Sequence, residues 1–302
     1  MTNTQAPDRP APAARPAPLD RLCPACLHSA PRFRRGPGGR PDASCPNCRS
    51  LERHRFLAVL LESMAPTVAS ARLVLDIAPS PQMTALLQRL RPARYLRVDF
   101  DPSADNRAVD VRASMTDLPL PAGSVDLALC YHVLEHIPDD AAAMAELARV
   151  LSAGGLALVQ VPWRPDRPTD EDPSADVQER LVRFGQADHV RWYGYDFETR
   201  LGKAGLSWLR ITPLEVLGPD AVEAFRLDAN EAVWLVRRAD GGQAPRELPA
   251  GALRHTLLAH LLAARRSAPA VPAPPAPAAQ PAPAAQPPRR AGWVSRRLGT
   301  RA

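Results

Sequence analysis

Short apolar runs alternate with amphipathic segments through the centre of the chain. Five of the runs have the length of buried strands: RLVLDI (72–77), RYLRVDF (94–100), RAVDV (107–111), VDLALCY (125–131) and LALVQV (156–161). Between them apolar residues return every three or four positions, as at Met83, Leu86, Leu87 and Leu90, which is the spacing of a helix. Strands that alternate with helices predict a parallel sheet with helices on both faces.

Residues that start and stop elements refine this pattern. Ser80 before Pro81 is typical of a helix N-cap and first turn. A second helix is expected after Pro138, and Gly154-Gly155 predicts a turn before the fifth strand. Near the end of the domain, LSWLRIT (206–212) and AVWLVRR (232–238) read as two more strands around a helix at 219–227.

Composition divides the chain into five segments. Many of the 35 prolines lie, together with alanine, in two stretches, 1–20 and 267–288, which lack the apolar content to fold and are expected to be disordered. The predicted segments are a tail (1–20), a cysteine-rich module (21–50), a connecting helix ended by Pro66 (51–68), an α/β domain (69–238), and a helix with a Pro/Ala-rich and Arg-rich tail (239–302). The leucine stripe of the helix at 247–266 suits docking on the main domain, or alternatively a membrane surface or a partner.

The net charge of +6 is unevenly distributed. Residues 21–68 carry eight arginines against three acids, and residues 239–302 carry nine against two, whereas residues 69–238 have 19 basic and 25 acidic residues. Basic ends can attract RNA or an anionic surface, but Lys203 is the only lysine among 38 basic residues, so the arginines also read as ordinary solvating charge.

Two C-x2-C pairs, Cys23/Cys26 and Cys45/Cys48, match the spacing of a zinc site with four thiolate ligands. Four protein ligands leave no open position, so we expect a structural Zn²⁺. No apolar run approaches the ~18–20 residues of a membrane span, and the first residues do not resemble a signal peptide. A cytoplasmic protein with reduced cysteines is therefore expected, with the fifth cysteine, Cys130, in the core.

Several blocks in order resemble class I S-adenosylmethionine (SAM)-dependent methyltransferases of the type 11 branch. They are LVLDIAPSP, YLRVDFDP, MTDLPLPAGSVDLALCYHVLEHIPDD and ELARVLSAGGLALVQVP, between residues 72 and 162. Over about residues 21–238 the chain also resembles a narrower group that joins a four-cysteine head, CPNCRSLERHR and FGQADHVRWYGYDFETRL. The resemblance implies a Rossmann-like, seven-stranded, mostly parallel sheet whose last two strands form an antiparallel pair.

The resemblance also implies where SAM binds. The turn at 76–80 is expected to hold its methionine end, Asp99 its ribose, and residues 114–115 its adenine. The cofactor-binding candidates are Asp76, Ala78, Ser80, Asp99, Ser114, Met115 and Tyr131. Ala78 and its neighbours replace the family's glycine-rich turn, and Ser114 stands where an acid is usual, with Asp117 nearby to compensate.

Candidate catalytic groups fall in two stretches. His132 follows the strand at 125–131 and is a candidate base, with Glu135 and His136 on the next turn. The region 163–200 is long for a loop and includes FGQADHVRWYG, in which Asp188 is expected to orient His189 as a base. Three residues of this stretch are candidates for substrate binding: Gln186, Arg191 and Tyr193. An ordinary ion pair between Asp188 and Arg191 is the structural alternative.

These features favour a methyltransferase that acts on a small molecule or glycan-type acceptor. One alternative is an RNA methyltransferase whose cysteine module and basic tails hold phosphates. Another is a non-catalytic adaptor in which the altered first turn no longer binds SAM. The sequence identifies neither the acceptor atom nor the oligomeric state.

Overall fold

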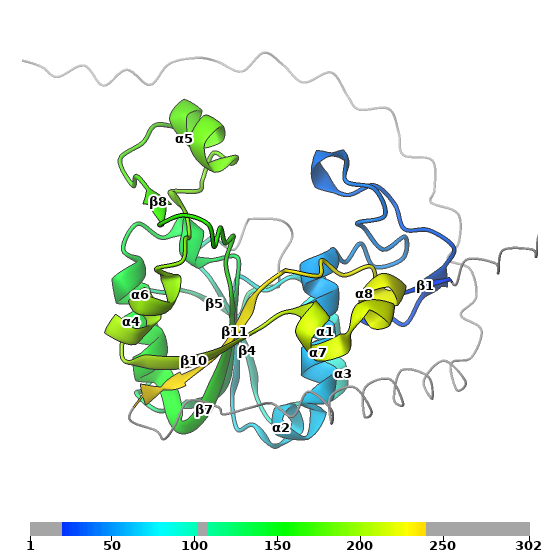
Figure 1. Cartoon of the computed structure of the whole chain (residues 1–302). Coiled ribbons are helices and arrows are strands. Elements are labelled where there is room, and N and C mark those ends of the chain that lie inside the picture. The colour runs from blue at the N-terminus through cyan, green and yellow to red at the C-terminus, as the bar shows by residue number, and fades with distance from the viewer. Residues whose placement is uncertain (1–19, 102–107, 240–302) are drawn as a thin grey trace, which may run out of the picture. The chain divides into compact units, whose positions relative to one another are not determined.

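The computed structural model describes residues 20–101 and 108–239 (Figure 1). The Pro/Ala-rich segments at 1–19 and 267–288 and the predicted helix at 247–266 lie outside these ranges. None of the helices within them combines the length and the apolar character that a membrane span requires.

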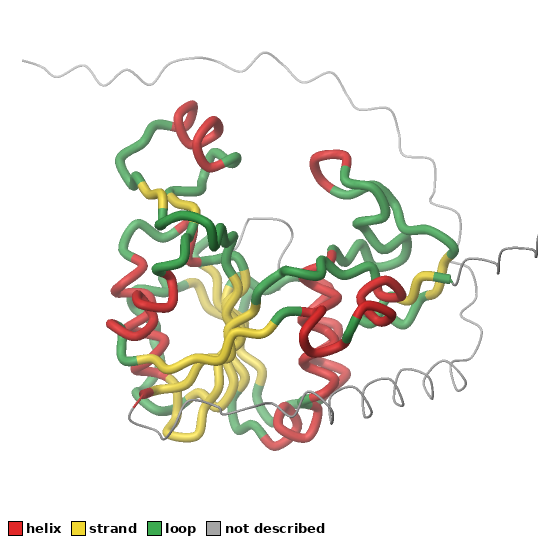
Figure 2. Tube along the Cα trace, viewed as in Figure 1, coloured by secondary structure: helices red, strands yellow, loops and turns green. Residues whose placement is uncertain are grey.

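A seven-stranded sheet in the order β10-β11-β7-β6-β3-β4-β5 forms the centre of the described chain (Figure 2). Its strands are β3 (Val74–Ile77), β4 (Tyr95–Asp99), β5 (Val111–Arg112), β6 (Val125–Tyr131), β7 (Leu151–Gln160), β10 (Leu206–Ile211) and β11 (Val233–Arg238). β11 runs antiparallel to both β7 and β10, while β7, β6, β3, β4 and β5 pair in parallel. This confirms the predicted Rossmann-like fold and the antiparallel pair at its end.

Helices cover both faces of the sheet because its strands bury side chains on both sides. Alternate residues of β6 enter different cores, with Leu127 and Leu129 in one and Ala128 and Cys130 in the other. The first core includes α1 (Glu52–Ser63), α2 (Ala65–Ser70), α3 (Pro81–Leu90), α7 (Pro213–Leu217) and α8 (Pro219–Phe225). The second includes α4 (Asp140–Val150) and α6 (Phe197–Lys203), which lie on the opposite side of the sheet in Figure 1.

Two predicted boundaries differ from the structure. Pro66 does not end the connecting helix; α1 ends at Ser63, and Pro66 lies in the first turn of α2, where proline needs no hydrogen-bond donor. Gly154-Gly155 does not form a turn before the strand but lies within β7, beside a register shift at Val125/Leu127. A Cβ on Gly155 would stand 2.7 Å from the carbonyl oxygen of Val125, so this close approach requires glycine.

The cysteine module contains β1 (Arg21–Leu22), β2 (Ser29–Ala30) and a 3-10 turn, η1 (Pro37–Gly39). The buried guanidinium of Arg55, on α1, joins this module to the main domain. It donates to the carbonyl oxygens of Ala43 (2.8 Å) and Ser50 (2.7 Å) in the module, and to that of Phe225 at the end of α8 (2.8 Å). These bonds satisfy buried carbonyls from three parts of the chain with one side chain.

An insert separates β7 from α6 in the region expected to form a long functional loop. It contains β8 (Asp170–Glu171), α5 (Val177–Phe184) and β9 (Arg191–Trp192). A second 3-10 turn, η3 (Leu134–His136), follows β6 and meets this insert, since the amide of Val190 donates to the carbonyl oxygen of Glu135 at 2.9 Å.

Candidate active site

The carboxyl ends of β3 and β6 lie side by side at the centre of the sheet, where the strand order changes direction. From β3 the chain proceeds through β4 to β5 on one side, and β6 then begins the other side. In open α/β sheets, the crevice outside such a switch point is where ligands bind. The fold therefore places the candidate site at residues that follow these two strands.

Ala78 and His132 occupy equivalent positions in this crevice. Each directly follows its strand, and each has a φ of +54°, in the left-handed region. Their amides complete the ladders, with Ala78 N donating to the Val98 carbonyl oxygen (2.8 Å) and His132 N to that of Gln160 (2.9 Å). A residue with a Cβ costs about 1–2 kcal/mol in this conformation, and such strain is concentrated at functional sites.

The candidates near the methionine end are held by hydrogen bonds within the fold. The Asp76 carboxylate, at 4% exposure, accepts from the Tyr95 hydroxyl at 2.6 Å, and burial together with the Asp76 charge raises the pKa of Tyr95. The Ser80 hydroxyl caps α3 by accepting from the Met83 amide, as the sequence predicted. Asp99, the last residue of β4, accepts from the Asp101 amide at 3.1 Å.

The remaining cofactor candidates lie around the end of β6. Ser114 forms a short turn in which its hydroxyl lies 2.8 Å from that of Thr116. Met115 is buried, with its sulfur 3.7 Å from that of Cys130 on β6. The Tyr131 hydroxyl is buried with no hydrogen-bond partner among the described residues, and burial raises its pKa well above the usual value.

His132 lines a cavity of about 500 Å³ at the same edge of the sheet. Its Nδ1 lies 3.0 Å from Oε1 of the fully buried Glu135, and its Nε2 has no partner in the described chain. Although burial raises the pKa of Glu135, the hydrogen bond and charge of His132 and the charge of His136 lower it overall. The buried carboxylate therefore fixes the imidazole of His132 through one nitrogen.

The sequence did not identify several other residues that line this cavity. They include Gln160 at the end of β7, whose carbonyl oxygen accepts from His132 N, and Asp228 and Glu231 before β11. Burial and the neighbouring Asp228 charge raise the pKa of Glu231 to about 8, so its carboxyl is largely protonated at neutral pH. These positions could have been found from the direction of β11: because it is antiparallel, its amino end lies at the carboxyl edge of the parallel strands.

The structure corrects the expectation that Arg191 and Tyr193 contact substrate. Both side chains are buried, at 1% and 0% exposure. Arg191 donates to the carbonyl oxygens of Leu134 and Pro138 at 2.8 Å each and also bonds that of Ile137, while the Tyr193 hydroxyl donates to Asp140 at 2.8 Å. Their side chains therefore hold the insert against η3. Arg191 pairs with Glu171 (3.1 Å) rather than with Asp188, so the expected structural alternative is corrected too.

Asp188 does not orient His189 as expected. The carboxylate is exposed and pairs with Nδ1 of His136 at 3.1 Å, whereas the ring of His189 is buried at 3% exposure. Asp188 lies exposed in a turn after α5 and the next residue is buried, so the two neighbouring side chains lie in different environments. Gln186 lies exposed on the same segment. The structure thus gives a buried carboxylate to His132 and an exposed one to His136.

The four cysteines of the module converge as the spacing predicted. Their sulfur atoms all lie within 4.8 Å of one another, with 3.7 Å between Cys23 and Cys48 and between Cys26 and Cys45. Four sulfurs arranged tetrahedrally at a Zn–S distance of about 2.3 Å would be about 3.8 Å apart. The donor set and its spacing therefore fit a zinc ion. The Ser50 hydroxyl, 3.1 Å from the Cys23 sulfur, supplies a polar neighbour.

Residues 67–159 match the family model described as a methyltransferase domain. This stretch of the chain is therefore similar to a methyltransferase domain. The match covers β3 to β7 and so includes both strained strand ends, and it bears out the resemblance noted from the sequence.

Curated relatives agree with this assignment. The chain is 36% identical over 111 residues to an uncharacterized methyltransferase of Mycobacterium sp. (strain JLS), covering 34% of this chain and 44% of that one. It is 32% identical over 126 residues to a probable S-adenosylmethionine-dependent methyltransferase of Mycobacterium tuberculosis (strain H37Rv), covering 38% and 46%. The chain thus spans somewhat less than half the length of these relatives.

Two solved structures are also similar to part of this chain. An S-adenosylmethionine-dependent methyltransferase from Mesorhizobium loti is 20% identical, with a TM-score of 0.43, and covers 61% of this chain and 97% of that one. The YcgJ protein from Bacillus subtilis is 21% identical, with a TM-score of 0.40, and covers 59% and 97%. TM-scores this low carry no argument about this chain.

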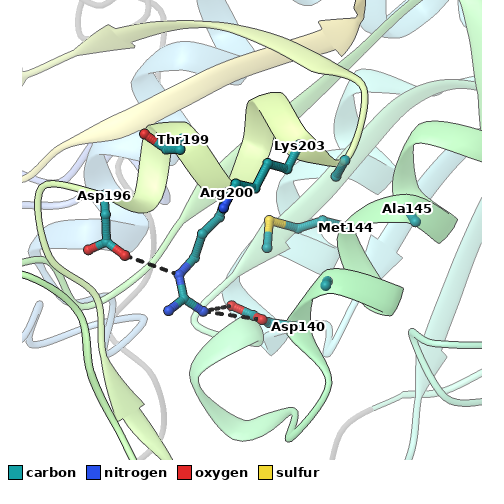
Figure 3. A pocket seen from close by; sticks show the side chains of 9 residues that line it. Asp140, Met144, Ala145, Asp196, Thr199, Arg200 and Lys203 are labelled. Atoms are coloured by element: carbon teal, nitrogen blue, oxygen red, sulfur yellow. Dashed lines mark hydrogen bonds and ion pairs between the residues drawn. The ribbon is translucent and has the colours of Figure 1, made fainter.

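A second hollow of about 380 Å³ lies on the flank of the main domain, between α4 and α6 (Figure 3). Figure 3 shows the Arg200 guanidinium pointing to Asp140 and Asp196, and the hydrogen bonds measure 3.1 and 3.3 Å. Arg200 is thus paired with two of the acids that line the hollow, and none of the strand-end residues lines it. We assign it a structural role, and the candidate active site remains the crevice and cavity at the carboxyl edge.

Proposed function

We propose that the chain is a SAM-dependent methyltransferase that acts on a small-molecule or glycan-type acceptor. The observation that carries the proposal is the placement of His132, backed by Glu135, between the β3–β6 crevice and a cavity of about 500 Å³. That volume lies within the usual range for small-ligand sites. SAM supplies an electrophilic methyl group, and the protein positions the acceptor and removes its proton where necessary.

In this proposal the crevice holds the cofactor through the residues expected from the sequence. Asp76, Ala78 and Ser80 lie at the methionine end, Asp99 accepts from the ribose hydroxyls, and Tyr131 closes the end of β6. Ser114 and Met115 lie beside the adenine. The N-terminus of α3, which starts at Pro81, offers backbone donors to a carboxylate.

His132 is the proposed base, since Glu135 holds its Nδ1 and its Nε2 lacks a partner in the described chain. His132 therefore takes the role of base that was expected of His189 oriented by Asp188. Both of those residues remain near the acceptor side in this proposal. Gln186 is proposed to contact the acceptor. A protonated Glu231, which also lines the cavity, can donate a hydrogen bond to an oxygen of the methyl acceptor.

Calorimetric titration with S-adenosylhomocysteine tests the cofactor assignment. We expect micromolar binding by wild type and about 10–100-fold weaker binding by Asp99→Ala, because hydrogen bonds to a charged group contribute about 1.5–3 kcal/mol. Asp166→Asn, which removes an exposed carboxylate paired with its neighbour Arg167, is the matched control and should bind like wild type. Absence of binding by the folded wild type would overturn the proposal in favour of a non-catalytic adaptor.

We also propose that the four cysteines bind one structural zinc ion, in keeping with a cytoplasmic protein whose thiols stay reduced. Metal analysis of the purified wild-type protein should detect bound zinc. The Cys45→Ser variant should contain about one equivalent less. Cys130→Ala is the matched control, because Cys130 is buried in the sheet away from the cluster. Unchanged zinc in Cys45→Ser would contradict the assignment.

The RNA alternative is weakened because two arginines of the module already pair with acids. Arg21 pairs with Glu223 at 2.8 Å and Arg40 with Glu52 at 3.2 Å. A small-molecule enzyme should keep nearly constant turnover between 50 and 200 mM salt. An enzyme that grips six or more phosphates would lose affinity by about a thousandfold or more over that range.

A further inference from the structure

A compact group of three metal-ligating side chains lies where η3 meets the insert. Glu135, His136 and His189 each present one ligand atom, and these atoms all lie within 4.8 Å of one another. The backbone bond from Val190 to Glu135 joins the two segments at this point. The group is distinct from the four cysteines and is separated from them along the chain.

Two atoms of this group are buried and lack hydrogen-bond partners. Glu135 is fully buried, and while its Oε1 lies 3.0 Å from His132 Nδ1, its Oε2 has no partner among the described residues. His189 is 3% exposed, and its Nδ1 likewise has none. Leaving a buried polar atom unpaired costs about 1–3 kcal/mol, and more for a charged carboxylate. Both atoms belong to side chains whose ligand atoms lie within 4.8 Å of one another, so an electrophile bound there would offset these costs.

The surrounding contacts are those that orient metal ligands. Nδ1 of His136 is held at 3.1 Å by the carboxylate of Asp188, which leaves Nε2 of the same ring for a ligand. A histidine fixed by a carboxylate through its second nitrogen is the usual outer-shell arrangement at protein metal sites. His132 plays the corresponding part for Glu135, because it occupies one carboxylate oxygen and leaves the other.

We propose that Glu135, His136 and His189 bind a divalent transition-metal ion. Two imidazole nitrogens and one carboxylate oxygen suit Mn²⁺, Fe²⁺, Co²⁺, Ni²⁺ or Zn²⁺, whereas Mg²⁺ and Ca²⁺ favour sites made of oxygen alone. Three protein ligands leave some coordination positions of the ion open. The ion would lie beside His132, which lines the cavity. The proposal does not depend on methyl transfer, because it concerns the binding of an ion.

The test uses the full chain with its cysteines loaded with one equivalent of zinc. Mn²⁺ is then added and the free ion is followed by electron paramagnetic resonance, since Mn²⁺ competes poorly for thiolates; Co²⁺ is followed by its visible spectrum. We expect saturable binding of one ion per chain, with a Co²⁺ spectrum that lacks thiolate charge-transfer bands. Glu135→Gln and His136→Ala should each weaken binding at least tenfold.

Matched variants separate ligand loss from misfolding. Glu179→Gln removes an exposed carboxylate of the same insert and should bind like wild type. If Glu135→Gln does not fold, as judged by circular dichroism, His136→Ala carries the test because its ring is one-third exposed. Failure of both ions to bind wild type at 1 mM, or equal binding by folded His136→Ala, would overturn the proposal whatever the outcome of cofactor titration.

Discussion

Two buried arginines perform the same task in two regions of the molecule. Arg55 joins the cysteine module to α8, and Arg191 joins the insert to η3. Each guanidinium bonds backbone carbonyls far from itself in the sequence, those of Arg191 all lying in the turn at 134–138. They differ in their other partners: Arg191 also pairs with the half-buried Glu171 at 3.1 Å, whereas Arg55 donates to carbonyl oxygens.

The comparison shows that an arginine can act as a structural crosslink where a sequence reads it as surface charge or as a substrate clamp. Five donors in a rigid plane allow one side chain to satisfy several carbonyls at once. The contacts of Arg55 (the module joint) and those of Arg191 (the insert joint) should then affect stability differently when they are lost. The reason is that α8 is part of the main core, whereas the insert lies outside the sheet.

The largest effect is expected from Arg55→Met. The substitution leaves the carbonyls of Ala43, Ser50 and Phe225 unsatisfied, and we expect a loss of about 3–5 kcal/mol in the free energy of unfolding. Denaturant unfolding measures it. Arg32→Ala, on the exposed surface of the module, should change stability by less than about 0.5 kcal/mol. A similar small change in Arg55→Met would show that the module does not depend on this joint.

Arg191→Met should have a smaller, local effect of about 2–4 kcal/mol, because it frees three carbonyls of the turn at 134–138 and leaves the core intact. Hydrogen exchange at the Val190 amide, which bonds Glu135, reports opening of this joint. Arg183→Met is the matched control, since Arg183 forms surface ion pairs on the same insert worth at most about 1 kcal/mol. Uniform loss of protection across the sheet would contradict a local role.

Tyr193→Phe should weaken the insert joint by about 1 kcal/mol. It removes the hydrogen bond to Asp140 (2.8 Å) and a longer contact with the Leu134 carbonyl oxygen (3.3 Å), while Asp140 retains Arg200 as a partner at 3.1 Å. Thermal unfolding of wild type and variant measures the difference. A loss above about 3 kcal/mol would show that the hydroxyl does more than complete these contacts.

The smallest expected effect is a dependence of the insert joint on pH, which distinguishes it from the module joint. The hydrogen bond from Arg200, followed by that from Arg191, lowers the pKa of Glu171 in the folded chain against the cost of burial. A lowered folded pKa stabilises the insert above the unfolded value, and this contribution is lost as pH falls through the folded pKa. Protection of Val190 should therefore fall on acidification below about pH 4.5 in wild type and less so in Glu171→Gln. Identical acid profiles would remove Glu171 from the joint.

Most of the fold could be predicted, because strand and helix periodicities are local properties of the sequence. The runs at 74–77, 95–99 and 125–131 became buried parallel strands, and Ser80 caps a helix as its position before Pro81 indicates. The cysteine cluster followed from spacing alone, since a C-x2-C turn brings two sulfurs together without help from the rest of the chain.

The side-chain partners could be predicted much less well. Asp188 and His189 are adjacent in sequence, yet one faces solvent and the other the interior. Arg191 looked like a free cation because its carbonyl partners, Leu134 and Pro138, lie more than 50 residues away. Glu231 was missed although the expected antiparallel direction of β11 places its amino end at the carboxyl edge of the parallel strands.

The Arg55 joint also has a consequence for the order in which the protein is made. The module lies early in the sequence, but its anchor carbonyl on Phe225 comes 170 residues after Arg55. At about 5–20 residues per second, synthesis of that interval takes about 10–30 s. During this time the contacts of the module with α1 and α3 can form, because those elements are made soon after it. The bond to Phe225 can be added only when synthesis has passed α8.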